Sequence, residues 1–171
     1  MQHDVLPDLL RPDLDLVFCG TAPGHVSARA QAYYAHKQNK FWPTLFAVGL
    51  TPRLFAPHEF PQLLDLNIGL TDLCKHASGM DHELPRDAFD VDGLRRKLET
   101  FRPRVLAFTS LNGGRAVCGK KAVYGPQELR IGDTELWIVP SPSPAAMNAW
   151  TLEPWRALSV RVRGSSASAG S

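Results

Sequence analysis

Short apolar runs alternate along this chain with segments in which apolar positions recur at helical spacing. The short runs have the length and composition of buried strands and lie at 14–19, 68–73, 105–108 and 136–139. Helices are predicted between and after them, at 27–34, 41–48, 58–66, 92–101, 111–118 and 153–162. This alternation predicts an α/β fold, a three-layer sandwich in which a central, mostly parallel sheet is flanked by helices.

The chain has 171 residues, enough for one domain with a substantial apolar core. We expect a single domain over residues 1–163, with a polar surface loop at 77–90 and a disordered Ser/Gly/Ala tail at 164–171. No apolar run is long enough to span a bilayer, and the polar, acidic start does not resemble a targeting peptide. A cytoplasmic location is therefore expected.

The cysteines and histidines show no spacing typical of a metal or cofactor site. Cys19, Cys74 and Cys118 form no Cys-x-x-Cys pair, and three thiolates cannot complete a four-cysteine iron–sulfur cluster. We therefore expect no metal, no cofactor and no disulfide framework.

The formal net charge of +2 neither requires nor excludes a nucleic-acid partner. Its distribution is uneven, because acidic residues gather at 4–15 and 81–92 and basic residues at 95–104, 115–121 and 156–163. For most of these side chains a solvated helix face is the simpler interpretation.

Two unusual loops each follow a predicted strand directly. The first is Gly20-Thr21-Ala22-Pro23-Gly24, a rigid turn with backbone N–H groups suited to a polar base edge or an anion. The second is Pro140-Ser141-Pro142-Ser143-Pro144. Because ligands of open α/β sheets bind at the carboxyl ends of the strands, both loops are expected at one edge, facing one pocket.

Aromatic and polar residues are interleaved over 33–42, in the order Tyr-Tyr-Ala-His-Lys-Gln-Asn-Lys-Phe-Trp. Such a segment suits a planar base that stacks in a pocket. Phe41 and Trp42 are better explained as the start of a core helix, whereas Tyr33 and Tyr34 are the stronger stacking candidates.

Together, these three segments resemble the uracil-DNA glycosylase superfamily, and most closely its mismatch-specific uracil/thymine branch, with similarity to the hypoxanthine-type members. The resemblance rests on the Gly-x-x-Pro-Gly turn, the aromatic-Ala-His-x-x-Asn-x-Phe-Trp segment and the Pro-x-Pro-Ser loop, in the correct order and strand context over about residues 14–162. It implies a monomeric, monofunctional DNA glycosylase of base excision repair, which flips out uracil or another deaminated or mismatched base and hydrolyses its N-glycosidic bond.

The same resemblance assigns roles to individual positions. Gly20, Thr21, Ala22, Pro23 and Gly24 would line the base pocket. Tyr34 matches the aromatic residue that stacks on the flipped base, Asn39 matches the Asn before Phe-Trp that shapes the pocket, and Ser141 would contact the substrate. The residues that would press into the minor groove are Pro142, Ser143, Pro144, Ala145 and Ala146, with the small Ala145 where relatives often place a bulky wedge.

One departure from the family pattern concerns catalysis. The usual catalytic Asn at the third position of the first motif is replaced by Ala22, which cannot form a side-chain hydrogen bond or transfer a proton. Asp72, at the end of a predicted strand, is the best substitute, because a carboxylate stabilises a cation-like sugar and activates water. The alternative is that Asp72 caps the following turn. Asn67 and Asn112 are weaker candidates.

Two other functions have some support in the sequence. Gly114 to Lys120 matches the G-x-x-x-x-G-K pattern of nucleotide hydrolases, but Lys121 stands where Ser or Thr would hold magnesium, and the segment has a helical pattern. The more serious alternative is a DNA-binding module of the same fold that recognises a lesion but cleaves weakly, as the missing Asn would suggest.

Overall fold

A five-stranded sheet forms the centre of the molecule. The computed structural model describes residues 3–85 and 87–169, with side chains as far as residue 164. The sheet has the order β2-β1-β3-β5-β4, and its strands are β1 (Leu16–Gly20), β2 (Ile68–Asp72), β3 (Val105–Phe108), β4 (Gly125–Ile131) and β5 (Thr134–Ile138). β1, β2, β3 and β5 are parallel, and β4 pairs antiparallel with β5.

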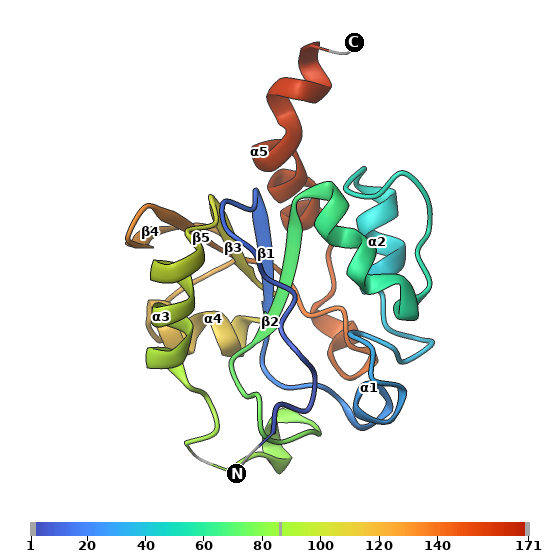
Figure 1. Ribbon diagram of the computed structural model, residues 1–171, viewed down its shortest axis with the longest axis vertical. Helices are drawn as coiled ribbons and strands as arrows, with labels where there is room; N and C mark the ends of the chain where they lie inside the picture. Colours follow the sequence, from blue (N-terminus) through green and yellow to red (C-terminus); the bar gives the residue numbers. More distant parts are fainter. Residues whose placement is uncertain (1–2, 86, 170–171) are drawn as a thin grey trace.

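Helices cover both faces of this sheet (Figure 1). One face packs against α3 (Val91–Phe101) and α4 (Leu111–Cys118). The other packs against α2 (Phe41–Ala47), the 3-10 helix η1 (Pro57–Leu66) and α5 (Glu153–Ala169). The remaining elements are α1 (His25–Ala30), η2 (Asp81–Glu83) and η3 (Pro144–Ala149). The predicted α/β three-layer fold is confirmed.

The alternation of side chains along β1 divides the core into two halves. Leu16 and Phe18 point to the α2–α5 face, whereas Val17 and Cys19 point to the α3–α4 face. All four side chains are buried, as the continuous apolar run of a parallel strand covered on both faces requires. On the α2–α5 face the Phe18 ring stacks on Trp155, with ring centroids 5.5 Å apart.

The chain before β1 packs closely against β2 and forms a short antiparallel bridge with it. Leu9 and Leu70 exchange two backbone hydrogen bonds of 2.9 Å in an antiparallel bridge. Beside this bridge, a Cβ placed on Gly69 would lie 2.5 Å from the carbonyl oxygen of Leu9 and 2.7 Å from Leu14 Cδ1. Position 69 therefore requires glycine, because any side chain would push the N-terminal segment off the sheet.

Three segments differ from the sequence expectations. The pattern predicts no strand over Gly125–Ile131, because β4 is a half-exposed edge strand whose composition is largely polar. The helix predicted over 27–34 begins and ends earlier, since Gln31 adopts a left-handed conformation after Ala30. The polar loop expected at 77–90 contains the short 3-10 turn η2.

The tail predicted to be disordered at 164–171 overlaps the end of α5, which extends to Ala169. The side chains of residues 165–169, and residues 170–171 entirely, lie outside the described part of the structure. The expected disorder of this tail therefore stays a prediction.

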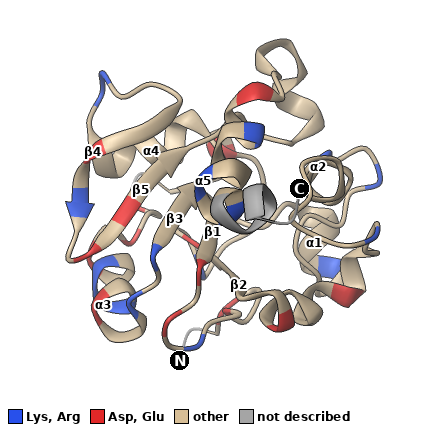
Figure 2. Ribbon diagram, turned by 90° about the horizontal axis from the view of Figure 1, so that it is seen from above, with Lys and Arg blue, Asp and Glu red and all other residues tan. Residues whose placement is uncertain are grey.

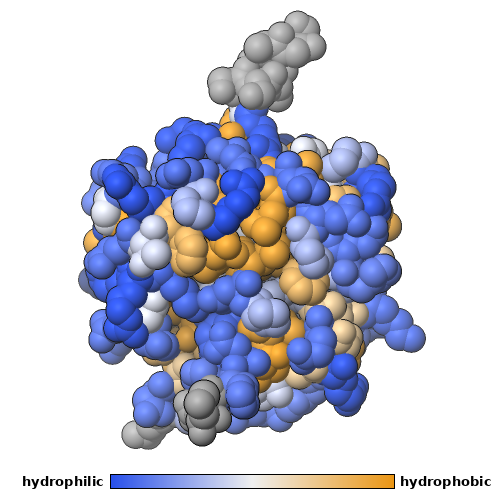
Figure 3. Space-filling view, viewed as in Figure 1, coloured by the Kyte–Doolittle hydropathy of each residue, from blue (hydrophilic) through white to orange (hydrophobic). Residues whose placement is uncertain are grey.

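Hydrophilic residues surround a smaller apolar area on the face shown in Figure 3. Within residues 3–85 and 87–169, no helix is both long and apolar enough to cross a membrane. The same residues contain no cluster of three or more His, Cys, Asp or Glu side chains that could hold a metal ion.

Substitution of Gly69 by alanine should destabilise the protein. The added methyl group would overlap the Leu9 carbonyl, so we expect the free energy of unfolding to fall by about 1–3 kcal/mol, the usual cost of overpacking. Thermal or urea unfolding measures this loss. Gly24→Ala is the matched control, because its Cβ would meet no atom within 4 Å, and an equal loss in both variants would contradict the close approach at Gly69.

Candidate active site

The carboxyl ends of four parallel strands meet at one edge of the sheet. In the register of β1 with β2, Gly20 lies opposite Asp72, and in that of β1 with β3, Cys19 lies opposite Phe108. The pairing continues beyond β5, because Val139 N–H donates to the Phe108 carbonyl at 2.9 Å. The loops that follow β1 and β5 therefore leave the same edge of the sheet, as the sequence predicts.

Gly20 lies at the centre of this edge and leaves no room for a side chain. A Cβ at this position would be 2.6 Å from Asp72 Oδ1, 3.2 Å from the Tyr34 hydroxyl and 3.7 Å from Thr109 Oγ1. Three polar side chains from three separate parts of the chain thus surround one backbone position. The glycine permits this approach, which any larger residue would prevent.

Asp72 is the most unusual of these groups. Its side chain comes from the last residue of β2, and the residue is only 5% exposed. Among the described residues, Oδ2 has no hydrogen-bond partner. Burial raises the pKa of this carboxyl to about 7, against the partly opposing charge of Lys75. The carboxyl is therefore poised to exchange a proton near neutral pH, a property that buried catalytic acids and bases share.

A second buried charge lies beside Asp72. Lys75 is 8% exposed, and its ammonium lies 3.9 Å from Asp72 Oδ2 but only 2.8 Å from Asp8 Oδ1. It also donates a hydrogen bond of 3.2 Å to the Tyr33 hydroxyl. The ammonium is thus bound mainly to the N-terminal segment, and Asp72 receives only its weaker, more distant attraction.

Tyr34 and Phe41 form the aromatic part of the site. Their rings are stacked with centroids 3.9 Å apart and planes 15° from parallel. The Tyr34 hydroxyl is 3.0 Å from Thr109 Oγ1, which follows β3. Tyr34 has a φ of 53°, a left-handed conformation that is uncommon for a bulky residue. Burial and the nearby Asp72 charge raise the pKa of this phenol well above its ordinary value, so it stays neutral.

Tyr33 does not have the stacking position that its sequence context suggests. It is buried in the core, and its hydroxyl donates to the Pro7 carbonyl at 2.9 Å. Trp42 is also in the core and donates from Nε1 to the Tyr33 carbonyl at 3.0 Å. Tyr34 is therefore the candidate of this pair that lies at the strand edge, while Phe41 and Trp42 belong to the core, as expected.

Asn39 has a local structural contact. Its Oδ1 accepts a hydrogen bond of 2.9 Å from the Phe41 N–H at the start of α2. This satisfies one of the free donors at a helix beginning and fixes the entry of α2. Asn39 thereby holds Phe41, and so supports the surface on which Tyr34 stacks.

The turn after β1 is fastened to the chain that follows β2. Cys74 N–H donates to the Thr21 carbonyl at 2.6 Å, and Gly79 N–H donates to the Pro23 carbonyl at 2.9 Å. The Thr21 hydroxyl donates to Asp81 Oδ1 at 2.8 Å. These contacts make the turn rigid, whereas Ala22 contributes no polar side chain.

Asn112, one of the weaker catalytic candidates, is occupied in the same network. Its Nδ2 donates to Asp81 Oδ2 at 2.6 Å. Asn67, the other candidate, precedes β2 and so lies at the opposite edge of the sheet. Of the three polar residues considered as substitutes for the missing Asn, only Asp72 lies beside Gly20.

The loop after β5 is organised by hydrogen bonds of its own serines. Ser141 Oγ accepts from the Ser143 N–H at 3.2 Å, and Ser143 Oγ accepts from the Ala145 N–H at the start of η3. Lys40 N–H donates to the Pro142 carbonyl at 2.9 Å. The loop is therefore connected directly to the segment that carries Tyr34 and Asn39.

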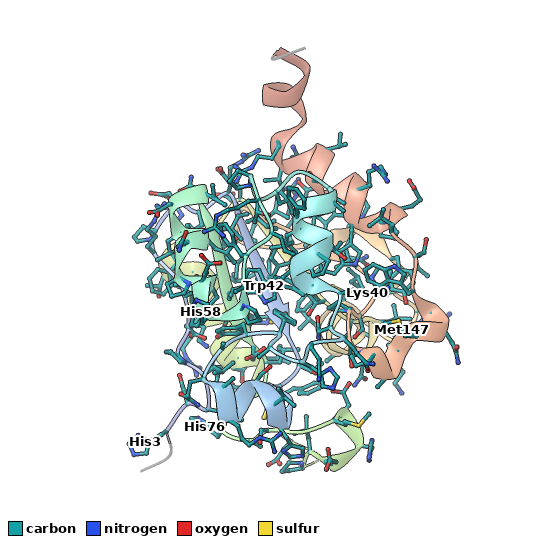
Figure 4. All side chains as sticks on the ribbon, turned by 90° about the vertical axis from the view of Figure 1, so that its right-hand side faces the viewer. His3, Lys40, Trp42, His58, His76 and Met147 are labelled. Atoms are coloured by element: carbon teal, nitrogen blue, oxygen red, sulfur yellow. The ribbon has the colours of Figure 1, made fainter. Side chains whose placement is uncertain are left out.

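Lys40 and Met147 lie on one side of the molecule (Figure 4). Met147, in η3, is 37% exposed although it is a large apolar side chain. The Lys40 ammonium lies 5.8 Å from the centre of the Trp150 ring, which follows η3. A cation, an aromatic ring and an exposed apolar side chain thus gather around the second loop.

Three of the arginines that cluster in the sequence lie at the opposite ends of the strands. Arg104 and Arg163 bind Asp15 before β1, at 3.5 and 2.9 Å, and Arg161 binds Glu135 at 2.8 Å. Figure 2, a view from the α5 end, shows Lys and Arg interleaved with Asp and Glu. These arginines balance carboxylates at the amino ends of the strands, so they are not available to the site edge.

Several residues of the site have no recognisable sequence signal. Asp8 and Lys75 belong to no motif, and Thr109 is an ordinary polar residue after a strand. Met147 lies three residues beyond the Pro-Ser loop, and only its exposure identifies it. The one general feature of Thr109 is that it directly follows a predicted strand, a position it shares with many residues that have no functional role.

Comparisons with known proteins bear on the family and on the fold. A family model described as the uracil DNA glycosylase superfamily matches residues 7–159. The fold is similar to that of a Methanosarcina acetivorans protein, solved by solution NMR and described as a "putative Uracil DNA glycosylase", with a TM-score of 0.65 and 22% sequence identity over 95% of this chain and 98% of that one. That likeness supports the fold, and the family model covers most of the sequence. The chain belongs to the uracil DNA glycosylase superfamily.

Proposed function

We propose that this protein is a monofunctional DNA glycosylase that removes uracil, or another deaminated or mismatched base, and that Asp72 is its catalytic residue. Within the superfamily we place it nearest the mismatch-specific branch, on the strength of its Gly20–Gly24 turn and its Pro140–Pro144 loop. The observation that carries the proposal is the buried carboxyl of Asp72 beside Gly20, whose Oδ2 accepts no hydrogen bond from any residue that the structure describes.

The proposed reaction is hydrolysis of the bond between the base and C1′ of its sugar. As the bond breaks, its electron pair leaves with the base and positive charge develops on the sugar. The Asp72 carboxylate stabilises that charge, and it accepts a proton from the water whose oxygen bonds to C1′. The products are a free base and an abasic site. A pKa of about 7 allows the same carboxyl to hold the proton and release it afterwards.

Recognition of the base would combine stacking with hydrogen bonds from the first turn. The flipped base would lie near Tyr34, whose ring is supported from behind by Phe41. Base–aromatic stacking stabilises by about 1–3 kcal/mol, which offsets much of the cost of extrusion. Because Ala22 is small, the pocket would accept bases other than uracil.

Docking on DNA would use the second loop and η3. Pro142, Ser143, Pro144, Ala145 and Ala146 form the part that would enter the minor groove. Met147 follows them and is exposed, so we assign it the apolar wedge that the small Ala145 cannot provide. Lys40, whose backbone is bound to this loop, would contact a phosphate without reading sequence.

A second candidate function is lesion binding without efficient cleavage. It is favoured by one observation, that Ala22 removes the side chain with which relatives position water. The two functions separate in one assay, in which purified protein is incubated with duplexes containing uracil opposite guanine and the abasic product is broken with alkali. Strand breaks support the glycosylase, while binding without breaks on uracil, hypoxanthine and thymine-mismatch duplexes supports the module.

Asp72→Asn should abolish most of the excision without abolishing DNA binding. The amide cannot accept the proton from water, so we expect the single-turnover rate to fall by about 10²–10⁴-fold. Affinity for a uracil duplex should change little, because Asp72 contacts no phosphate in the proposed complex. Asp65→Asn, on the exposed side of η1, is the matched control and should cut at the wild-type rate. A fully active Asp72→Asn variant would refute the assigned role.

The same substitution should change stability in a pH-dependent way. The pKa of Asp72 is about 7 in the folded protein and 3.8 as an ordinary value, so folding binds a proton between these limits. Wild-type stability therefore falls, relative to Asp72→Asn, as pH rises from about 4 to about 7, and the difference stays level above that. Thermal unfolding of both proteins across this range measures it. A constant difference at every pH would show that Asp72 titrates normally.

Met147→Ala should weaken excision from duplex DNA more than from single strands. A wedge compensates the loss of stacking when a base leaves a duplex, and a single strand has no such gap to fill. We expect a fall of about 10-fold in duplex activity and little change on single strands. Leu129→Ala is the control, since Leu129 is an exposed apolar residue on the distant edge strand β4. Equal losses on both substrates would contradict a wedge.

A further inference from the structure

The N-terminal segment places a carboxylate where it competes with Asp72 for Lys75. The Lys75 ammonium is 2.8 Å from Asp8 Oδ1 and 3.9 Å from Asp72 Oδ2. Both Lys75 and Asp72 are buried, so neither group can exchange its partner for water at low cost. Which of the two carboxylates receives the ammonium is therefore decided by how firmly Asp8 is held.

Asp8 is held from several sides. Its Oδ2 binds the Lys97 ammonium of α3 at 2.7 Å, and its Oδ1 accepts a hydrogen bond of 2.7 Å from the Thr71 hydroxyl. Burial would raise the pKa of Asp8, but the charge of Lys75 and the hydrogen bonds from Lys75, Lys97 and Thr71 hold it below its ordinary value. Asp8 therefore stays ionised at neutral pH.

The backbone around Asp8 is fixed as well. Val5 N–H donates to the Lys75 carbonyl at 2.6 Å, and the Pro7 carbonyl accepts from the Tyr33 hydroxyl. Leu6 and Leu9 are buried in the core on either side. The carboxylate of Asp8 is thus presented to Lys75 by a segment that is anchored at several points.

We propose that Asp8 is a positioning residue, which retains the Lys75 ammonium at 2.8 Å and so leaves the Asp72 carboxyl with only a long, 3.9 Å contact to that ammonium and available to the attacking water. The inference rests on the proposed role of Asp72. A carboxylate in close contact with an ammonium is strongly favoured in its charged form and is a poor proton acceptor. With Lys75 bound to Asp8, the carboxyl of Asp72 keeps its affinity for a proton.

The other groups that face Asp72 do not disturb this balance. Cys19 of β1, Tyr33 and Tyr34 all adjoin it, and burial raises the pKa of each well above its ordinary value, so they are neutral. The charged neighbours are Asp8, Lys75 and Lys97. Asp8 binds both ammonium groups, and its negative charge opposes their lowering of the Asp72 pKa.

The test is a carboxyl-carbon NMR titration of Asp72 in the full-length protein, in wild type, Asp8→Asn and Lys75→Met. Asp8→Asn removes a negative charge and releases Lys75 toward Asp72, so the pKa of Asp72 should fall by at least about one unit. Lys75→Met removes the nearest ammonium, so the pKa should rise. Opposite shifts are diagnostic, because loosening of the fold would hydrate Asp72 and move its pKa downward in both variants.

The pH dependence of excision should follow the titration. In Asp8→Asn the acidic limb of the pH–rate profile should move to lower pH, and in Lys75→Met to higher pH, as expected of a base that must be ionised. Asp8→Glu keeps the charge and should restore the wild-type profile. Asp4→Asn, an exposed position in the same segment paired with His76 at 3.7 Å, should leave it unchanged.

Failure of this inference is distinguishable from failure of the proposed function. If the Asp72 titration is unchanged in Asp8→Asn, or moves in the same direction in both variants, Asp8 does not position Lys75, whatever the activity. If the wild-type protein removes no base from any duplex, the proposed glycosylase activity is refuted. The Asp8–Lys75 contact would then have no role in catalysis. Should Asp8→Asn not fold, the rise expected in Lys75→Met decides the question, and a fall there refutes it.

Discussion

The close approach between the backbone of Gly20 and the carboxyl of Asp72 is the constraint on which the site depends. It requires β1 and β2 to be parallel, in a register that places these two residues side by side, and it requires glycine at position 20. It also forces the carboxyl into a space where, within the described part of the chain, Oδ2 finds no hydrogen-bond donor. A buried carboxyl without a hydrogen-bond partner costs stability, and proteins retain such groups where function needs them.

The charged residues are arranged differently at the two ends of the strands. At the amino ends of the strands, arginines are bound to carboxylates and tie α5 and the chain before β3 to the sheet. At the carboxyl ends, the cation next to the second loop is Lys40, which approaches an aromatic ring. These arginines form ion pairs that stabilise the fold, so they do not contribute to a DNA-binding surface. The modest net charge of the chain is compatible with a small, localised nucleic-acid surface.

The parts of the structure that the sequence predicts are those with local signals. The buried strands and the helices at 92–101 and 111–118 follow from apolar periodicity, and Asp72 is identifiable because it ends a strand.

The sequence does not predict β4, because an edge strand that is half exposed needs no apolar pattern. Tyr33 and Tyr34 cannot be told apart, because the left-handed turn that sends one ring to the core and the other to the strand edge leaves no trace in composition. The role of Asp8 cannot be predicted from the sequence for a different reason. Its partners are distant in the chain, and only the fold brings them together; they are Thr71, Lys75 and Lys97.

The anchoring of the N-terminal segment also links the site to elements that are distant in the chain. Asp8 precedes β1, but one of its cations comes from α3 and its hydroxyl donor comes from β2. Contacts of such long sequence separation cost more loop-closure entropy than local ones. The electrostatic state of the site is therefore a property of the whole fold: the register of β1 and β2 places Gly20 beside Asp72, but the charge balance around that carboxyl also requires α3, which supplies Lys97.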